Sequence, residues 1–209
     1  MKLYGYWRSS CSWRVRIALN IKELEYTYVP VHLVSNGGEQ HASEYLSLNP
    51  QAQVPTLELA SGVSLTQSIA IVEFLEEIKP SPSLFPKDRL QRARTRQMAE
   101  LINSGIQPLQ NLSVLQEVER QGLDKAEWGR AYIQKGLAAL NDLASQDDDL
   151  FLTGHTPSVA DLCLIPQLYN ARRFKCNLEL FPRLLEVEKR CSELEAFIQA
   201  HPDNQPDAQ

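Results

Sequence analysis

A run of hydroxyl and thiol side chains near the amino terminus could stabilise a bound anion. The run reads Ser9-Ser10-Cys11-Ser12 and follows a short β-prone segment, a pattern that favours the capped start of a helix. Main-chain N–H groups and the positive end of the helix dipole favour an anion there. A thiolate carried by a cofactor would suit this position, and so would a thiolate on Cys11, because a helix N-terminus lowers a thiol pKa. The alternative is that the serines only cap the helix.

Two other short segments could bind a small peptide-like ligand. Val54 precedes Pro55 at the start of a predicted strand, and proline cannot donate to a sheet ladder. A cis bond would leave the Val54 N–H and C=O open to a ligand backbone, but the residues alone leave the isomer open. Gln67 and Ser68 begin a predicted helix, where N–H groups and a hydroxyl could hold a carboxylate. Ser68 could equally be an ordinary N-cap.

Alternating strand and helix patterns must position these groups. Strands are predicted at residues 2–6, 26–32, 56–59 and 63–66, and helices from the serine run to residue 22 and over 68–79. The order predicts a thioredoxin-like α/β domain at residues 1–80. A proline-rich linker follows near residues 80–88.

The rest of the chain has a helical pattern, which predicts an all-α domain at residues 88–209. Helices are expected over residues 90–120, kinked at Gly105 and Pro108, over 126–145 before an acidic run at 147–149, and over 184–200. Ser158 and Asp161 have the spacing of a capping box. The polar tail at residues 202–209 is expected to fray.

Composition excludes several classes of partner. The 209 residues include 21 Lys plus Arg against 26 Asp plus Glu, a formal net charge of -5, so no broad positive field exists for nucleic acid or anionic lipid. A basic site for a small anion must be local. The clusters that could supply one are Arg8 with Arg14 and Arg16, the arginines of residues 89–96, and Arg172 with Arg173.

Targeting and cysteine patterns indicate the compartment. Arg8 interrupts the amino terminus before a signal peptide could form, and no apolar run could span a bilayer. The four cysteines are irregularly spaced, without the spacing of a zinc site. We therefore expect a cytoplasmic protein with no structural disulfide, no metal, no membrane partner and no nucleic-acid partner.

The three polar segments together resemble the glutathione transferase family, and the first one resembles its zeta class. Residues 9–19, SSCSWRVRIAL, are similar to the signature of that class, and residues 107–113 and 170–175 are similar to two of its other stretches. The resemblance covers nearly the whole chain. It implies a thioredoxin-like domain that binds glutathione, a helical domain that contributes the substrate pocket, a cis Val54–Pro55 bond and a homodimer.

Transferred position by position, the resemblance implies a role for each polar residue. Ser9 would hydrogen-bond the glutathione thiolate, with Ser10 and Cys11 beside it. Val54 would pair with the cysteinyl backbone of glutathione. Gln67 and Ser68 would hold the γ-glutamyl end of glutathione. The rest of the pocket would be completed by Gln40, Gln107, Asn111 and Ser113.

Two arginines are implied to bind substrate carboxylates. Arg8 and Arg173 are the candidates because a guanidinium group matches a carboxylate geometrically and in charge. The neighbouring Arg172 leaves open which member of the pair faces the pocket. The substrate would be a small keto acid with two carboxylates.

The implied activity is the glutathione-dependent isomerisation of maleylacetoacetate to fumarylacetoacetate. The thiolate would add to the cis double bond, rotation would follow about the resulting single bond, and glutathione would leave unchanged. Three alternatives stay open: maleylpyruvate as the substrate, a thiol-transferase that uses Cys11 as its nucleophile, and a glutathione-binding protein without catalysis. The intact polar set argues against the last.

Overall fold

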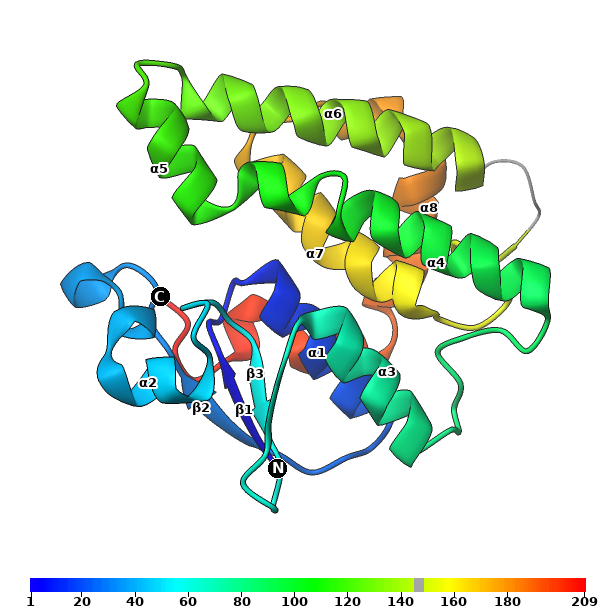
Figure 1. The fold of residues 1–209 in the computed structure, drawn as a ribbon. Helices are drawn as coiled ribbons and strands as arrows, with labels where there is room; N and C mark the ends of the chain where they lie inside the picture. Colours follow the sequence, from blue (N-terminus) through cyan, green and yellow to red (C-terminus); the bar gives the residue numbers. More distant parts are fainter. Residues whose placement is uncertain (145–148) are drawn as a thin grey trace. The chain divides into compact units, whose positions relative to one another are not determined.

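The structure is a computed structural model that describes residues 1–144 and 149–209 in two compact units (Figure 1). The first unit comprises Met1–Ser83 together with Leu194–Gln209, and the second comprises Leu84–Glu193. The second unit begins within the predicted linker. The segment from Leu194 onward packs within the first unit, although the sequence pattern grouped it with the helices before it. The division into domains at residues 80–88 remains a proposal.

The first unit contains a mixed sheet of four short strands. They are β1 (Lys2–Gly5), β2 (Thr27–Pro30), β3 (Thr56–Glu58) and β4 (Ser64–Thr66), in the order β2-β1-β3-β4. β1 pairs with β2 in parallel, whereas β1 with β3 and β3 with β4 are antiparallel. A parallel strand–helix–strand unit followed by an antiparallel hairpin is the thioredoxin-like arrangement, so the predicted fold class is confirmed.

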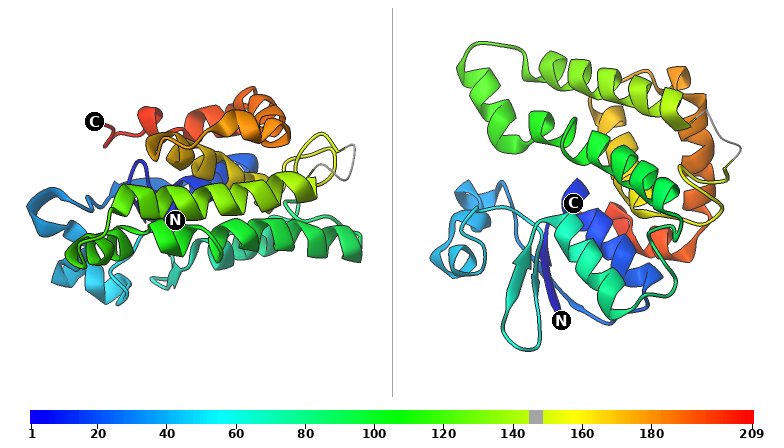
Figure 2. Two further views of the ribbon diagram at one scale, coloured as in Figure 1. Left: turned by 90° about the horizontal axis from the view of Figure 1, so that it is seen from above. Right: turned by 45° about the vertical axis from the view of Figure 1, so that its right-hand side comes forward.

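Two helices of the first unit pack against α1. α1 (Ser10–Ile21) lies beside α3 (Ser68–Ile78) in both views, and α9 (Glu195–Ala200) packs on α1 (Figures 1 and 2). Because it is covered by these neighbours, α1 buries every side chain from Ser12 to Leu19. The short α2 (Ser43–Leu48) was not predicted, since six residues are too few for a clear helical period.

The second unit consists of helices. They are α4 (Arg89–Asn103), α5 (Leu112–Arg120), α6 (Lys125–Ala144), α7 (Val159–Arg173) and α8 (Pro182–Ser192). α4 and α6 lie side by side, and α7 packs against α4, α6 and α8 (Figure 2). α7 is buried along most of its length, including the side chains of Asp161 and Gln167.

Two helix predictions are wrong in detail. The stretch at residues 90–120 is not one kinked helix, because α4 ends at Asn103 and a 3-10 turn, Gln107–Gln110, separates it from α5. Pro108 lacks an N–H donor and so favours this break. The expected helix at residues 184–200 is likewise two helices, because Leu194 is extended. The expected end of the preceding helix at Ser145 and the start of the acidic run at Asp147 lie outside the described residues.

The predicted capping box at the start of α7 is confirmed. Ser158 donates its main-chain N–H to Asp161 Oδ2 over 2.8 Å, and Leu152 N–H donates to Asp161 Oδ1 over 2.9 Å. Burial raises the pKa of Asp161 to about 6, although the hydrogen bonds that it accepts oppose this shift. Asp161 thus connects the start of α7 to the segment before it.

The prediction that the tail at residues 202–209 frays is wrong. Pro202–Asn204 forms a 3-10 turn, and the Trp7 N–H donates to Asp207 over 3.0 Å. Composition could not reveal this contact, because the donor that a tail carboxylate binds depends on which main-chain N–H groups the fold leaves unpaired. Among the described residues, none of the helices is long and apolar enough to cross a membrane.

Candidate active site

The serine run forms the start of α1, as its sequence predicts. Ser9 is the N-cap, and its hydroxyl accepts the Ser12 N–H over 3.3 Å. Ser9, Ser10 and Cys11 are half-buried, whereas Ser12 is fully buried and accepts the Tyr6 N–H over 3.4 Å. The first turn contains no acidic side chain. The positive end of the helix dipole is therefore not neutralised by a local carboxylate, and three polar side chains remain accessible beside it.

Two of the three arginines near this run are structural, which corrects the predicted cluster. Arg14 and Arg16 are fully buried. Arg14 Nη1 donates to the Ser68 hydroxyl over 2.8 Å, and Arg16 Nη2 donates to the Trp7 carbonyl over 2.7 Å. Their spacing along α1 turns them into the core, where main-chain and hydroxyl oxygens bind them. They are not available to a ligand.

Arg8 remains as the basic side chain next to the α1 start. Its guanidinium carbon lies 5.4 Å from the centroid of the Trp7 ring and 5.8 Å from that of Tyr6. Both distances are within the range of a cation–π interaction. The side chain is half-buried, and within the described part of the chain no carboxylate pairs with it. An anionic group of a ligand could therefore bind the Arg8 guanidinium.

The start of α3 differs from the prediction in which residue caps the helix. The N-cap is Gln67, with a φ of 68°, and Ser68 is the first helical residue. Ser68 is almost fully buried and accepts its hydrogen bond from Arg14, so it is not the cap. The exposed Gln67 side chain donates to Gln51 Oε1 over 2.8 Å. A left-handed φ is costly for glutamine, so the surrounding fold must hold Gln67 in this conformation.

Two features of the first unit fit a peptide-like ligand such as glutathione. The Val54–Pro55 bond is cis, as the resemblance implied, and none of the described residues bonds to the main-chain N–H or C=O of Val54. Gln40 is 6% exposed and donates to the Leu33 carbonyl over 3.2 Å, yet its Oε1 has no partner among the described residues. Buried polar atoms are normally satisfied, and a ligand N–H would satisfy this one.

The predicted glutathione contacts of the second unit lie around the start of α5. Gln107 is buried in the 3-10 turn, and Asn111 caps α5 by accepting the Ser113 N–H over 3.4 Å. Asn111 and Ser113 are exposed. The capping bond gives Asn111 a structural function that sequence reasoning did not assign. Its amide nitrogen still projects donors that a ligand could use.

The adjacent arginines at the end of α7 have different contacts. Arg172 forms a two-pronged ion pair with Glu188, with both N···O distances at 2.6 Å. This pair raises the pKa of Arg172. Arg173 is exposed and donates to Asn170 Oδ1 over 3.0 Å. A carboxylate therefore occupies the Arg172 guanidinium.

A buried amide pair in the second unit was missed by the sequence reading. Gln110 Nε2 donates to Gln167 Oε1 over 2.8 Å, and Gln167 Nε2 donates back over 3.3 Å. The pair joins the 3-10 turn that carries Gln107 to the buried face of α7. Glutamines at positions 110 and 167 give no local signal of pairing, because the contact spans two elements far apart in sequence.

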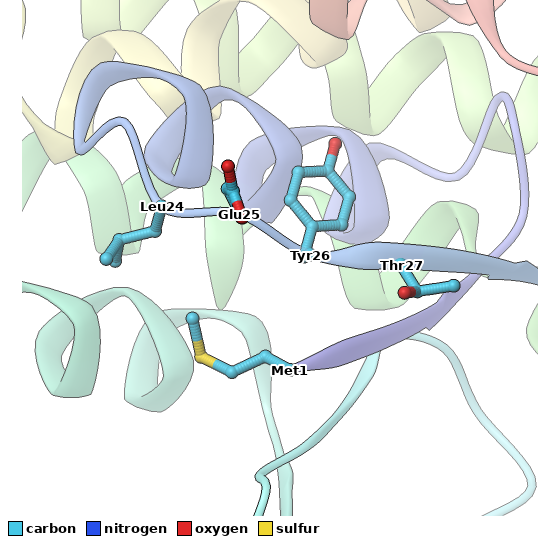
Figure 3. Close-up of a pocket in the computed structure, with 5 residues that line it drawn as sticks. All are labelled: Met1, Leu24, Glu25, Tyr26 and Thr27. Atoms are coloured by element: carbon cyan, nitrogen blue, oxygen red, sulfur yellow. The ribbon is translucent and has the colours of Figure 1, made fainter.

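The first unit also contains a hollow (Figure 3). It is lined by Met1, Leu24, Glu25, Tyr26 and Thr27 at the start of β1 and β2. α1 begins after the other end of β1, so the hollow and the serine run lie at opposite ends of this strand. Its lining includes no thiol and no basic side chain. Elsewhere too, no group of three or more His, Cys, Asp or Glu side chains among the described residues could hold a metal.

Comparison with known proteins identifies the family of this chain. A family model described as glutathione S-transferase, N-terminal domain, matches residues 8–78. The probable maleylacetoacetate isomerase 2 of Drosophila melanogaster is 46% identical over 205 residues, which cover 98% of this chain and 89% of the relative.

Two solved structures are similar over the whole chain. A holo maleyl pyruvate isomerase, a bacterial zeta-class glutathione S-transferase, is 39% identical with a TM-score of 0.96 and 100% coverage of both chains. The maleylacetoacetate isomerase of Anaeromyxobacter dehalogenans 2CP-1, with GSH bound in its active site, is 46% identical with a TM-score of 0.91, covering 100% of this chain and 97% of the other. The chain therefore belongs to the zeta class of the glutathione transferase family.

Proposed function

We propose that the protein isomerises maleylacetoacetate to fumarylacetoacetate with glutathione as its cofactor. The observation that carries this proposal is the start of α1, where an accessible serine cap, two further polar side chains and Arg8 gather around a helix end without an acidic residue. Bound glutathione supplies a thiolate that adds to the cis double bond and leaves after rotation. The chain itself must stabilise that thiolate and hold the substrate.

The residues of the first unit fit a cofactor of this kind. The Val54 main chain is open to pair with a peptide backbone, and the unpartnered Gln40 Oε1 can accept an N–H. Gln67 and the first turn of α3 can hold a carboxylate through main-chain N–H groups. Gln107, Asn111 and Ser113 are proposed as further contacts. The donor set matches a small acidic peptide and offers nothing specific to a nucleotide or a flavin.

Ser9 is proposed to donate its hydroxyl hydrogen to the cofactor thiolate. The hydroxyl oxygen already accepts the Ser12 N–H, which leaves its hydrogen free to point toward a ligand. A charge-assisted bond of this type stabilises the ionised sulfur at neutral pH. Ser10 and Cys11 lie next to it in the first turn and add polarity, and Cys11 is not required as a nucleophile in this mechanism.

Arg8 and Arg173 are proposed to bind the two carboxylates of the substrate. Enolate charge that develops during addition would also be stabilised by a nearby guanidinium. We expect Arg173→Ala to lower kcat/KM by about tenfold to a hundredfold, since a charge-assisted bond contributes roughly 1.5–3 kcal/mol. Glutathione affinity should hardly change. Steady-state kinetics and a glutathione titration on this variant would measure both.

Arg172→Ala is the matched control for this prediction. It removes a guanidinium from the neighbouring position, but that guanidinium is already paired with Glu188. Kinetics should stay near those of the wild type. A larger kinetic loss in Arg172→Ala than in Arg173→Ala would exchange the two assignments, and an unchanged kcat/KM in both would remove this helix end from the substrate site.

One specific observation supports maleylpyruvate as an alternative substrate. The solved structure with a TM-score of 0.96 to this chain is a maleyl pyruvate isomerase. The deciding experiment is to assay the purified protein with glutathione and each of the two cis keto-diacids. Faster turnover of maleylacetoacetate supports the proposal, faster turnover of maleylpyruvate replaces it, and no turnover of either would overturn the isomerase assignment.

We also propose that the protein is a homodimer, as the family resemblance suggests, and that it is cytoplasmic, as its irregularly spaced cysteines led us to expect. Exposed apolar residues such as Leu90, on α4, are available for a subunit contact. Light scattering at micromolar concentration should give twice the mass of the 23.7 kDa chain. A mass equal to that of one chain would contradict the dimer.

A further inference from the structure

Both main-chain groups of Trp7, two residues before the serine cap of α1, are held by charged side chains. The Trp7 N–H donates to Asp207 Oδ2 over 3.0 Å. The Trp7 carbonyl accepts from Arg16 Nη2 over 2.7 Å. Hydrogen bonds to ionised groups are stronger than neutral ones. Trp7 is thus fixed between a carboxylate from the end of the chain and a guanidinium from α1.

The two charged groups are themselves anchored inside the first unit. Arg16 is fully buried, and its Nε and Nη2 both donate to the Ala200 carbonyl, over 3.1 and 3.0 Å. Its guanidinium carbon lies 5.8 Å from the centroid of the Tyr28 ring. The Tyr28 hydroxyl in turn lies 3.3 Å from Asp207 Oδ2 and donates to it. One polar network therefore joins α1, β2, the end of α9 and the tail.

The position of Trp7 determines the position of the two proposed active-site groups that follow it. Arg8 is the next residue, and its guanidinium stacks on the Trp7 ring at 5.4 Å. Ser9 follows, and its N–H closes a turn onto the Tyr6 carbonyl over 3.0 Å. A displacement of Trp7 would consequently move both the Ser9 hydroxyl and the Arg8 guanidinium.

The tail also reaches the loop that carries Gln40. The Gln209 side-chain amide lies 3.1 Å from His32 Nε2. His32 Nδ1 accepts the main-chain N–H groups of Val34 and Ser35, over 3.2 and 2.8 Å. The His32 ring also packs edge-on against Tyr6 at 5.1 Å between centroids. The end of the chain thus contacts two first-unit segments, the one before the Ser9 cap and the one before Gln40.

We propose that Asp207 is a positioning residue for catalysis, which holds Ser9 and Arg8 in place through the Trp7 main chain. The inference rests on the proposed function, because it assumes that Ser9 stabilises the cofactor thiolate. Asp207 does not touch the ligand and is not a catalytic residue. It fixes the geometry on which the Ser9 hydrogen bond depends.

The test compares Asp207→Ala with Asp207→Asn. Alanine removes the acceptor of the Trp7 N–H, whereas the asparagine carbonyl keeps an acceptor at the same place. In Asp207→Ala we expect kcat/KM to fall by about tenfold, since a misplacement on the order of 1 Å can cost up to about a hundredfold. We also expect the pKa of the bound glutathione thiol, titrated by ultraviolet absorbance, to rise. Asp207→Asn should restore most of both quantities.

Asp203→Ala is the control from the same tail. Asp203 is exposed, and its carboxylate lies 3.6 Å from His201 Nδ1 without contacting the Trp7 segment. It should leave the thiol pKa and kcat/KM unchanged. If Asp207→Ala fails to fold, Asp207→Ser takes its place, because serine replaces the carboxylate with a single shorter hydroxyl group and keeps the position polar.

Two outcomes would overturn the proposal. One is a folded Asp207→Ala or Asp207→Ser protein with the thiol pKa and kcat/KM of the wild type. The other is a lowered melting temperature in both Asp207→Ala and Asp207→Asn with no change in the thiol pKa, which would indicate a structural role alone. A wild-type protein that bound glutathione but isomerised neither keto-diacid would refute the proposed function, and the thiol pKa would still decide the role of Asp207.

Discussion

Ser9 at the start of α1 and Ser158 at the start of α7 both occupy the N-cap position, but their surroundings differ. Ser9 is half-buried and caps one N–H, in a first turn that contains no acidic residue. Ser158 is 2% exposed, and both its N–H and its hydroxyl donate to Asp161 over 2.8 Å. The first helix start is open to an external anion, whereas the second contains its own.

The comparison shows what distinguishes a functional cap from a structural one. Both sequences place serine before an apolar helix, so the serine itself carries no information on its role. The carboxylate three residues after Ser158 satisfies the helix start internally. At the equivalent position after Ser9 the residue is Ser12, which is turned into the core. The first turn of α1 therefore has no carboxylate of its own.

Ser9→Ala should produce the largest effect on function. We expect kcat/KM to fall roughly a hundredfold to a thousandfold, which is typical for the loss of one preorganised donor to a developing or stabilised anion. The cost in folding stability should be only about 1 kcal/mol, as for other lost N-caps. Kinetics combined with urea unfolding would measure both.

Ser9→Thr is the control, because it keeps a hydroxyl at the cap and should retain part of the activity. If Ser9→Ala lost stability but kept its activity, α1 would resemble α7 and the distinction between the two caps would fail.

Asp161, which caps the start of α7, should make the folding stability depend on pH. Its pKa is raised by burial from 3.8 to about 6, so the folded state binds this proton more tightly than the unfolded state. The stability from this group is present below the unfolded pKa and is lost as pH rises through about 6. The loss should be on the order of 3 kcal/mol.

The measurement is the free energy of unfolding at a series of pH values for the wild type and Asp161→Asn. Asparagine does not titrate, so the difference between the two proteins should move in favour of Asp161→Asn as pH rises between about 4 and 6. A difference that stayed constant over this range would show that the Asp161 pKa is not raised on folding.

Cys11→Ala should have the smallest effect. Cys11 lies in the first turn of α1 beside Ser9, but the thiolate of the proposed mechanism belongs to glutathione. We expect a measurable fraction of the isomerase activity to remain, within about tenfold of the wild type, since no charge-assisted bond is lost. Complete loss of activity, or a mixed disulfide with glutathione trapped on Cys11 in the wild type, would favour a thiol-transferase.

The sequence by itself determined the order of the elements and the position of the helix start that we propose as part of the active site. Period-two and period-3.6 patterns located β1, α1, β3, β4 and α3 to within a few residues. Serine and aspartate three positions apart predicted the capping box of α7, because that motif is satisfied within one turn. Local signals were sufficient wherever the interacting groups are close in the chain.

Only the tertiary structure decided which polar residues face inward and what they bind. The sequence predicted Arg14 and Arg16 as part of a basic cluster, yet both are buried because α1 is covered by α3 and α9. The bond from Trp7 to Asp207 joins residues 200 positions apart. No local pattern encodes such a pair, since the acceptor that a buried donor binds depends on which segments the fold brings near it. Local sequence thus specifies where each helix starts. The charged residues that bind the segment before α1, Asp207 and Arg16, are brought to it only by the packing of distant segments.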